Sequence, residues 1–301
     1  MREKFIERRF QAKALRVVEQ ANQIIDDYQD QGFALTLRQL YYQFVARDLM
    51  PNTTKSYDYL GWVVNLGRQA GLIDWSAIED RTRETMRWRS WTSPRDVIEE
   101  TARCYAEDPW ADQPVRPEVW IEKSALVNLI EPACRDWHVP FLACRGYNSL
   151  SETYASAKKF QQLIGLGFEP VVLHLGDHDP SGLDMTRDVH DRLDLFVRVS
   201  VEVRRLALNM DQVRQYRPPP NPAKESDKRF KDYKCEPGDQ SWELDALEPN
   251  VIDRLLRQEI ESLVDKRSWK AARRGEEKNR DTLDEVLARW GEVEAMVNGR
   301  R

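Results

Sequence analysis

Apolar residues recur at helical spacing through the first quarter of the chain. Between residues 3 and 30 they return every three or four positions, which predicts a long amphipathic helix that ends near Gly32. The same spacing predicts a second helix over 35–48, with Thr36 as its N-cap, and a third over 55–70. This part of the chain is therefore expected to be helical, with short turns between the helices.

The segment after the third helix has a different pattern. Residues 71–75 form a short, mostly apolar segment, so we expect a strand that leads into a wing. Three helices followed by a hairpin indicate a winged-helix (CAP-like) domain over residues 31–92, preceded by an N-terminal helix at 1–30. A winged helix often places its second helix on DNA, although it also serves protein contacts.

From residue 117 the pattern changes to short apolar runs that alternate with helical segments. The runs expected to form strands are 119–121, 141–144, 171–175 and 196–208, and the helices between them are 124–136, 151–164 and 181–193. Buried strands that alternate with helices are typical of a parallel sheet. The sequence therefore predicts a Rossmann-like α/β domain with a four-stranded parallel sheet over residues 117–210.

The remaining segments are expected to connect or extend these domains. Residues 93–116 are punctuated by proline and predict a linker, and residues 211–249 predict an irregular extension rich in proline and lysine. Residues 250–301 predict C-terminal helices, near 250–266 and 281–297. The expected fold class is thus α/β plus α.

Charge and cysteine content narrow the function classes. The 301-residue chain has a net charge of −5, which by itself argues against nucleic acid, but residues 204–234 carry nine basic and four acidic side chains. Nucleic-acid binding depends on the local electrostatic field rather than on the net charge, so this basic segment could contact nucleic acid. The alternative is that these residues form an ordinary solvated surface. The four cysteines lack metal-binding spacing, so neither a disulfide framework nor a zinc site is expected. Without a secretory signal or an apolar membrane span, we expect a cytoplasmic protein.

Three acidic residues follow predicted strands. Glu122 comes directly after the first strand, and Asp177 and Asp179 come directly after the third. The carboxyl ends of parallel strands meet at one edge of the sheet, and clustered carboxylates repel one another unless a hard cation such as Mg²⁺ neutralises them. The alternative is a simple turn in which the aspartates cap a helix.

The same residues carry a resemblance to a known family. The segment 119–123, the glycine at 146 and the run Gly176-Asp177-His178-Asp179-Pro180-x-Gly182 resemble the Toprim domain, in the version of the topoisomerase VI A subunit and its meiotic break-making relatives. The resemblance implies that Glu122, Asp177 and Asp179 bind Mg²⁺, or Mn²⁺, and that Glu122 can take part in proton transfer. His178 is a conceivable further ligand, but we expect it to be a solvent-facing turn residue.

The resemblance extends to a tyrosine on the second helix. The family has a winged helix before its Toprim domain, with a nucleophilic tyrosine in an Arg-x-x-Tyr-Tyr setting, and residues 38–42 match that pattern. Tyr41 belongs to an apolar stripe with Leu37 and should face the core. Arg38 and Tyr42 lie one turn apart on a different face, where an arginine can hold a phosphate beside the phenol. Alternatively, Tyr42 has no chemical role.

The resemblance implies a homodimeric, metal-dependent enzyme that cleaves double-stranded DNA as a topoisomerase does. Tyr42 would attack a phosphodiester to give a 5′-phosphotyrosyl link, and the tyrosine of one subunit would face the metal site of the other. No phosphate-binding glycine-rich loop is present, so ATP dependence would require a separate ATPase subunit. A Toprim nuclease of a defence system or mobile element, without tyrosine catalysis, is the second hypothesis. A non-catalytic winged-helix DNA-binding regulator is the third.

Several basic residues are expected to contact the DNA backbone. Residues 218–234 are either a DNA-contacting loop or a disordered tether. The residues expected on DNA are Arg38, Lys55, Lys123, Lys224, Lys228 and Arg229.

Overall fold

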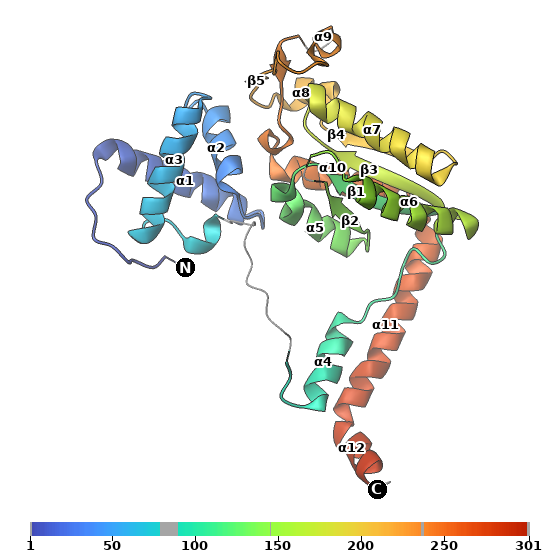
Figure 1. Cartoon of the computed structure of the whole chain (residues 1–301). Coiled ribbons are helices and arrows are strands. Elements are labelled where there is room, and N and C mark those ends of the chain that lie inside the picture. Colours follow the sequence, from blue (N-terminus) through green and yellow to red (C-terminus); the bar gives the residue numbers. More distant parts are fainter. Residues whose placement is uncertain (1, 79–89, 145, 236–237, 300–301) are drawn as a thin grey trace.

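The computed structural model describes residues 2–78, 90–144, 146–235 and 238–299. Its first part is a helical domain made of three helices, which lies beside a larger α/β domain (Figure 1). These helices are α1 (Ala12–Gln29), α2 (Leu37–Ala46) and α3 (Thr54–Gln69).

The start of α2 follows from its sequence. Thr36 and Gln39 form a capping box: the Thr36 hydroxyl accepts from the Gln39 backbone N–H at 3.2 Å, and the Gln39 side chain accepts from the Thr36 N–H at 2.8 Å. The N-cap expected at Thr36 is therefore confirmed. Leu40 and Phe44, on the next turns of the helix, are fully buried in the core of the helical domain.

Two expected elements of this domain are wrong. Residues 71–75 form no strand; instead the Asp74 side chain accepts from the Ser76 N–H at 2.8 Å and starts a 3-10 helix, η1 (Trp75–Ala77). The N-terminal helix also begins only at Ala12, because the backbone at Phe5 donates to Gln69 at 2.7 Å and runs along the end of α3. The expected wing falls partly on residues 79–89, outside the described residues, so the winged helix is not confirmed.

The α/β domain contains the four-stranded parallel sheet that the alternating pattern predicted. Its strands are β1 (Val115–Ile121), β2 (Phe141–Ala143), β3 (Glu169–Leu175) and β4 (Glu202–Ala207), in the order β2-β1-β3-β4. All three pairings are parallel. The fourth strand is shorter than expected because α7 continues to Val197.

Helices cover both faces of the sheet, so the domain has three layers (Figure 1). One face packs against α5 (Val127–Asp136) and α10 (Pro249–Ser262), and the other against α6 (Leu150–Gly165) and α7 (Pro180–Val197). Side chains alternate between the faces: Ile121 packs on the α5 side, and its neighbour Trp120 packs on the α6 side. Burying such a side chain contributes about 1.5–3 kcal/mol, so the strand ends are held firmly.

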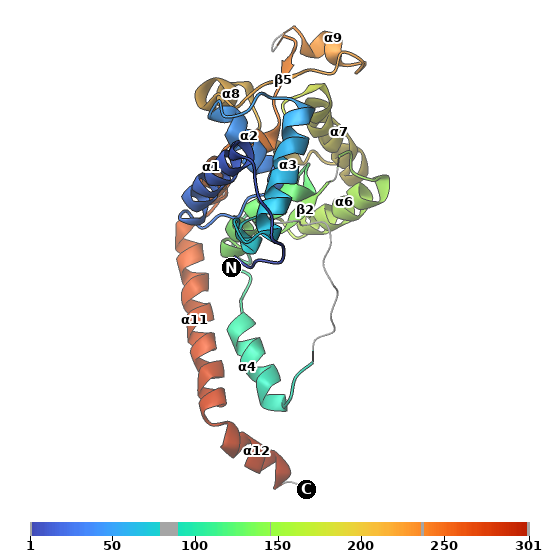
Figure 2. The same ribbon diagram turned by 90° about the vertical axis from the view of Figure 1, so that its left-hand side faces the viewer.

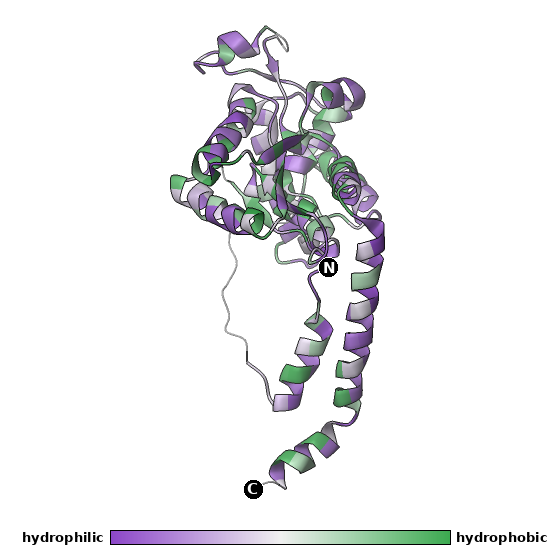
Figure 3. Ribbon diagram, turned by 90° about the vertical axis from the view of Figure 1, so that its right-hand side faces the viewer, coloured by the Kyte–Doolittle hydropathy of each residue, from purple (hydrophilic) through white to green (hydrophobic). Residues whose placement is uncertain are grey.

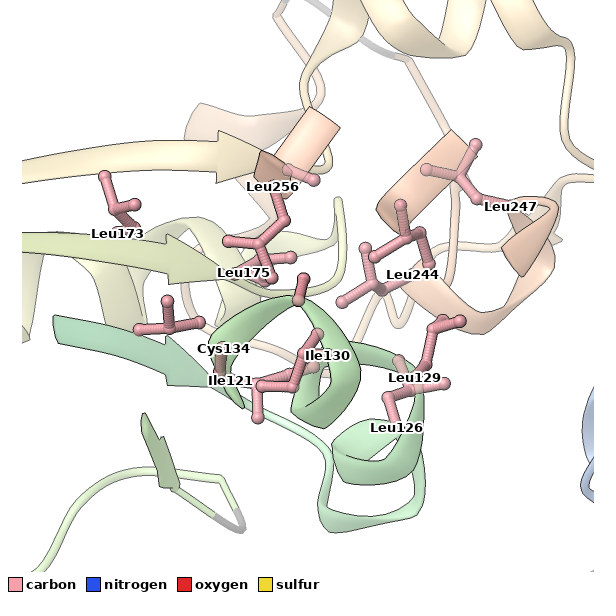
Figure 4. Close-up of a cluster of buried hydrophobic side chains, with 14 of the residues drawn as sticks. Ile121, Leu126, Leu129, Ile130, Cys134, Leu173, Leu175, Leu244, Leu247 and Leu256 are labelled. Carbon is pink, nitrogen blue, oxygen red and sulfur yellow. The ribbon is translucent and has the colours of Figure 1, made fainter. Parts of the chain in front are cut away.

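The segment after β4 contains more short elements than its composition predicted. They are α8 (Met210–Tyr216), the β5–β6 hairpin (Asn221–Pro222 and Gln240–Ser241), α9 (Phe230–Tyr233) and the 3-10 helix η3 (Leu244–Ala246). Leu244 and Leu247 enter the core formed by Ile121, Leu175 and the α5 side chains (Figure 4). This packing places Glu243 and Asp245, the polar neighbours of Leu244 in the sequence, beside the ends of β1 and β3.

Three helices form an arm that projects from the two domains (Figures 1 and 2). They are α4 (Pro94–Cys104), α11 (Lys266–Ala288) and α12 (Trp290–Asn298), so the segment expected to be a linker contains a helix. Polar and apolar residues alternate along α11 and α12 (Figure 3). Glu276 is buried in the arm, where it pairs with Arg273 and Arg280. Among the described residues, none of the helices has both the length and the apolar character needed to cross a bilayer.

The turn between β3 and α7 requires a glycine at position 182. A Cβ atom added to Gly182 would lie 2.2 Å from the Asp177 carbonyl oxygen, a distance that no real contact allows. The close approach folds residues 177–182 into a compact turn, with Pro180 at the first position of α7.

We expect Gly182→Ala to destabilise the protein by about 1–3 kcal/mol, because the added methyl group must displace backbone. Urea unfolding of the variant and the wild type measures the difference. Gly165→Ala, at the end of α6, is the matched control: its methyl group would meet nothing within 4 Å, so it should be neutral or slightly stabilising. Equal unfolding midpoints for Gly182→Ala and the wild type would contradict this account of the turn.

Candidate active site

A cavity of about 480 Å³ lies where α2 faces the carboxyl ends of β1 and β3. It is lined by residues from both domains and from the β5–β6 hairpin. The lining includes Arg38, Tyr41, Tyr42, Asn52, Lys123, Asp177, Asp179, Asn221, Lys224, Trp242 and Glu243. The structure therefore brings the predicted tyrosine and both predicted aspartates to a single cavity.

Glu122 and Asp177 are joined at the strand ends. The backbone N–H of Asp177 donates to the Glu122 carboxylate at 2.9 Å, across the adjacent ends of β1 and β3. One oxygen of Asp177 accepts from the Leu244 N–H at 2.8 Å. The strand order thus brings Glu122 next to the backbone of Asp177, while the Asp177 carboxylate itself binds the Leu244 N–H and Lys123.

Asp179 has a structural role in addition to its place in the cavity. Its carboxylate accepts from the Gly182 N–H at 2.5 Å and from the Ser181 hydroxyl at 2.8 Å, so it is the N-cap of α7. The alternative in which an aspartate of this turn caps a helix therefore applies to Asp179, which also lines the cavity together with Asp177.

Lys123 is a cation placed among three carboxylates. Its ammonium lies 2.9 Å from Asp177, 2.7 Å from Glu243 and 3.0 Å from Asp245. Burial would lower the pKa of Lys123, but the three carboxylates outweigh it and raise the pKa. The lysine therefore stays charged and neutralises part of the acidic cluster.

The acidic cluster keeps an excess of negative charge in spite of Lys123. Burial is the largest effect on both Glu122 and Asp177 and raises the pKa of each carboxyl. Neighbouring carboxylates act in the same direction: Asp179 raises the pKa of Glu122, and Glu122 raises that of Asp177. A further cation at this place would relieve the repulsion.

Arg38 connects the helical domain to the same cluster. Its guanidinium lies 2.5 Å from Glu243 and 3.2 Å from Asp245, whose side chain is only 2% exposed. The pKa of Arg38 is raised, because these two carboxylates outweigh the effect of burial. Arg38 is thus on the predicted face of α2, but in this structure it binds carboxylates of its own chain.

Tyr42 is buried at the domain contact and is 3% exposed. Its hydroxyl accepts from the Asn221 side chain at 3.1 Å, and the same amide donates to Glu243 at 3.3 Å. Burial, and then the Glu243 carboxylate, raise the pKa of Tyr42. Arg38 opposes this change only weakly, so in this arrangement the Tyr42 side chain is a neutral phenol.

The other tyrosine is a packing residue, as the apolar stripe predicted. Tyr41 is buried in the core of the helical domain, and its hydroxyl accepts from the Thr53 N–H at 2.8 Å. It supports the turn before α3, and it also borders the cavity.

The carboxylates suit a hard divalent cation in their chemistry, since Mg²⁺ binds oxygen donors. Among the residues that the structure describes, however, no three His, Cys, Asp or Glu side chains are arranged to hold a metal ion. Asp177 already pairs with Lys123, and Asp179 caps α7. Mg²⁺ often takes only one or two protein carboxylates and completes its shell with water and phosphate oxygens. A metal ion at these carboxylates would therefore have to displace Lys123 from Asp177 and take its remaining ligands from water and the substrate.

The predicted DNA-contacting residues have different surroundings. Lys224 is exposed and lines the cavity, whereas Lys55 and Lys228 are exposed outside its lining. Arg229 forms ion pairs with Asp184 at 2.7 Å and Asp227 at 2.8 Å. Arg229 therefore has local carboxylate partners that a phosphate would have to displace.

One prediction for the turn itself is wrong. His178 is buried rather than solvent-facing: its ring lies 3.2 Å from the Tyr233 hydroxyl, and its backbone pairs with Trp242. The turn sequence alone could not predict that His178 is buried, because Trp242 and Tyr233, which cover it, come from the distant segment after β4.

Four site residues escaped the sequence prediction. Glu243, Asp245 and Asn221 come from the segment that was expected to be irregular, although Glu243 and Asp245 repeat the two-residue spacing of Asp177 and Asp179. The fourth, Arg205 on β4, donates to the carbonyls of Asp177 at 2.6 Å and Gly182 at 2.9 Å. It holds the turn in place, and nothing in the strand sequence marks it.

Comparison of the chain with protein-family models and with curated protein sequences gives no match. A functional assignment therefore depends on the chain's own motifs and geometry.

We expect Lys123→Met to destabilise the protein by about 3 kcal/mol, because it leaves Asp177, Glu243 and Asp245 buried without their shared cation. Urea unfolding at neutral pH measures the loss. Lys158→Met is the matched control: Lys158 is exposed on α6, where it donates to the Gln161 side chain and lies over the Tyr154 ring, so its removal should change stability by less than about 0.5 kcal/mol. Similar small effects of the two changes would show that Lys123 does not neutralise the cluster.

Proposed function

We propose that this chain is a metal-dependent DNA strand-cleaving protein of the topoisomerase VI A type, with a winged-helix domain followed by a Toprim domain. Tyr42 is the nucleophile, and Glu122, Asp177 and Asp179 hold a divalent cation beside the phosphate. The observation that carries the proposal is the shared cavity: Tyr42 from α2 and Asp177 and Asp179 from the end of β3 line the same space.

The cavity supplies the positive charge that a phosphate needs. Arg38 and Lys123 both line it, and Lys224 lies at its edge in an exposed position. Arg38 and Lys123 now share the Glu243 carboxylate. A DNA phosphate would compete with Glu243 for both cations, which are the kind of donors that recognise phosphate oxygens.

The reaction is a transesterification. A bond forms between the Tyr42 hydroxyl oxygen and phosphorus, while the bond from phosphorus to the 3′ oxygen breaks. The phenol loses its proton, and the 3′ oxygen gains one to leave as a hydroxyl. A bound Mg²⁺ ion would stabilise the charge on the phosphate oxygens. Glu122, at the strand end, is the carboxylate that the family resemblance assigns to proton transfer.

A second candidate is a Toprim nuclease in which water attacks the phosphate. One observation favours it: the Tyr42 hydroxyl is buried, and its pKa is raised, so that the phenol is a weak nucleophile in this arrangement. In that case Tyr42 would serve only to close the cavity.

Replacement of Tyr42 separates the two candidates. Supercoiled DNA is incubated with the protein and Mg²⁺ or Mn²⁺, denatured with detergent, and analysed with and without protease. We expect the wild type to leave DNA covalently attached to protein, and Tyr42→Phe to lower this adduct at least 100-fold, because the attacking oxygen is gone. Tyr154→Phe is the matched control, since Tyr154 is 50% exposed on α6, away from the cavity.

Three outcomes would contradict tyrosine cleavage. Cleavage by Tyr42→Phe at the wild-type rate without an adduct would favour the nuclease. An adduct that persists in Tyr42→Phe would place the nucleophile elsewhere. DNA that is bound but never cut, with binding indifferent to Asp177→Asn and to metal, would favour a non-catalytic DNA-binding protein.

A further inference from the structure

The first fifteen residues of α11 carry seven basic side chains, which fall into two sets. Lys266, Arg273 and Arg280 each pair with a carboxylate of the chain, at 2.9, 3.0 and 2.8 Å. The other four are exposed, and none of them forms an ion pair within the part of the chain that the structure describes. These four, which we call the basic stripe, are Arg267, Lys270, Arg274 and Lys278.

The basic stripe lies on one face of the helix. Its members are separated by steps of three, four and four residues, so each stands about one helical turn from the next. At 1.5 Å per residue the stripe extends over about 16 Å of the helix axis. Glu276, which is buried, comes about two and a half turns after Arg267 and therefore lies on the opposite side. Arg280, on that side, donates to the Tyr105 carbonyl just after α4 at 2.9 Å, so the stripe faces away from α4.

The charges of the basic stripe are unfavourable for the helix that carries them. Lys270, Arg274 and Lys278 are like charges four residues apart, a spacing that destabilises a helix. The neighbouring acidic residues are not paired with them: Asp265 is the N-cap and accepts from the Ser268 N–H at 2.8 Å. An anion bound along the stripe would remove this repulsion.

The composition of this face indicates which kind of anion it fits. Helical spacing places only the small Ala271 among the four cations, and the large Trp269 instead packs against the Trp110 and Trp137 rings at 5.4 and 5.2 Å. A helix of a second copy or a lipid bilayer would require apolar side chains within the stripe. A line of cations alone fits a regular polyanion, and each strand of duplex DNA carries a phosphate about every 3.4 Å along its axis.

We infer that the basic stripe binds the phosphate backbone of duplex DNA, outside the cleavage cavity and without reading the base sequence. The choice of DNA rests on the proposed function, which requires a duplex at the two domains from which the arm projects (Figures 1 and 2). No residue of the stripe lines the cavity. The arm therefore adds affinity for DNA that is independent of the residues that cut it.

The salt dependence of DNA binding tests the inference. The whole 301-residue chain is titrated into a short fluorescent duplex at several KCl concentrations, with EDTA to prevent cleavage, and anisotropy gives the binding constant. Each phosphate contact contributes about 0.9 to the slope of log K against log salt concentration. Replacing all four stripe residues with glutamine, a good helix former, should therefore reduce the slope by about 3 to 4, equally for duplexes of different sequence.

Two further variants, with as many substitutions, are the controls. The first replaces with glutamine four exposed cations that already have carboxylate partners, and it should change the slope by less than about 1. These cations are Arg47, Arg187, Arg214 and Arg289. The second exchanges arginine and lysine within the stripe, which keeps the charges and should keep the slope. Circular dichroism and urea unfolding check that every variant is folded.

Three results would overturn the inference and leave the proposed function intact. One is an unchanged slope in the glutamine variant, with DNA still bound. Another is an equal fall in the paired-cation control, because net charge rather than the stripe would then determine the slope. The third is an unchanged slope together with loss of self-association on gel filtration, which would assign the stripe to a second copy.

Failure of the proposed function gives a different pattern. If the wild type leaves no covalent adduct on supercoiled DNA but the glutamine variant loses the slope, the stripe binds DNA and tyrosine cleavage is wrong. If the wild type binds no duplex at any salt concentration, both the proposed function and the inference are wrong.

Discussion

The architecture of the site depends on one cation, the Lys123 ammonium, and the three carboxylates around it. Asp177 comes from the end of β3, and Glu243 and Asp245 come from the segment beside η3. Without the lysine these groups would repel one another, and the segment 240–247 would lose its ion pairs at the strand ends while keeping the packing of Leu244 and Leu247. With it, Glu243 is placed to bind Arg38 of the helical domain. This partly buried lysine thus links the strand ends, through Glu243, to Arg38 of the helical domain.

The Lys123 ammonium and the Arg38 guanidinium share one carboxylate partner, Glu243. Because both pair with this carboxylate, under the proposed function a phosphate would compete with Glu243 for these two cations. A polyanion such as DNA offers many phosphates and can displace one carboxylate at each cation.

The sequence predicted the parts of this structure that local pattern controls. Alternation of apolar runs with helices indicated the parallel sheet, and strand ends indicated that Glu122 and Asp177 would meet. It failed where distant segments decide the outcome. His178 is buried because Trp242 and Tyr233 cover it. A local cap was also missed, since residues 71–75 turn where the Asp74 carboxylate starts a 3-10 helix. Neither cause lies in the periodicity of the segment itself.

For the site, too, the sequence predicted residues within local motifs but not those that distant segments contribute. The Toprim-like motif and the Arg38–Tyr42 pair pointed to Arg38, Tyr42, Asp177 and Asp179, which the structure brings to one cavity, whereas Glu122 lies behind Asp177 and is not part of its lining. Glu243, Asp245 and Asn221 were missed because their segment has little regular secondary structure, and its place is decided by the burial of Leu244 and Leu247. A second acidic pair with two-residue spacing was the one local signal, and a pair of this kind is common on solvated surfaces.

The most direct test of the account is a crystal structure of the protein grown with Mn²⁺, in which anomalous scattering locates the metal. The account predicts a manganese ion beside Glu122, Asp177 and Asp179, in a cavity that the same chain's Tyr42 also lines. Well-ordered crystals with no metal at these carboxylates, or with Tyr42 of that chain outside the cavity, would contradict it.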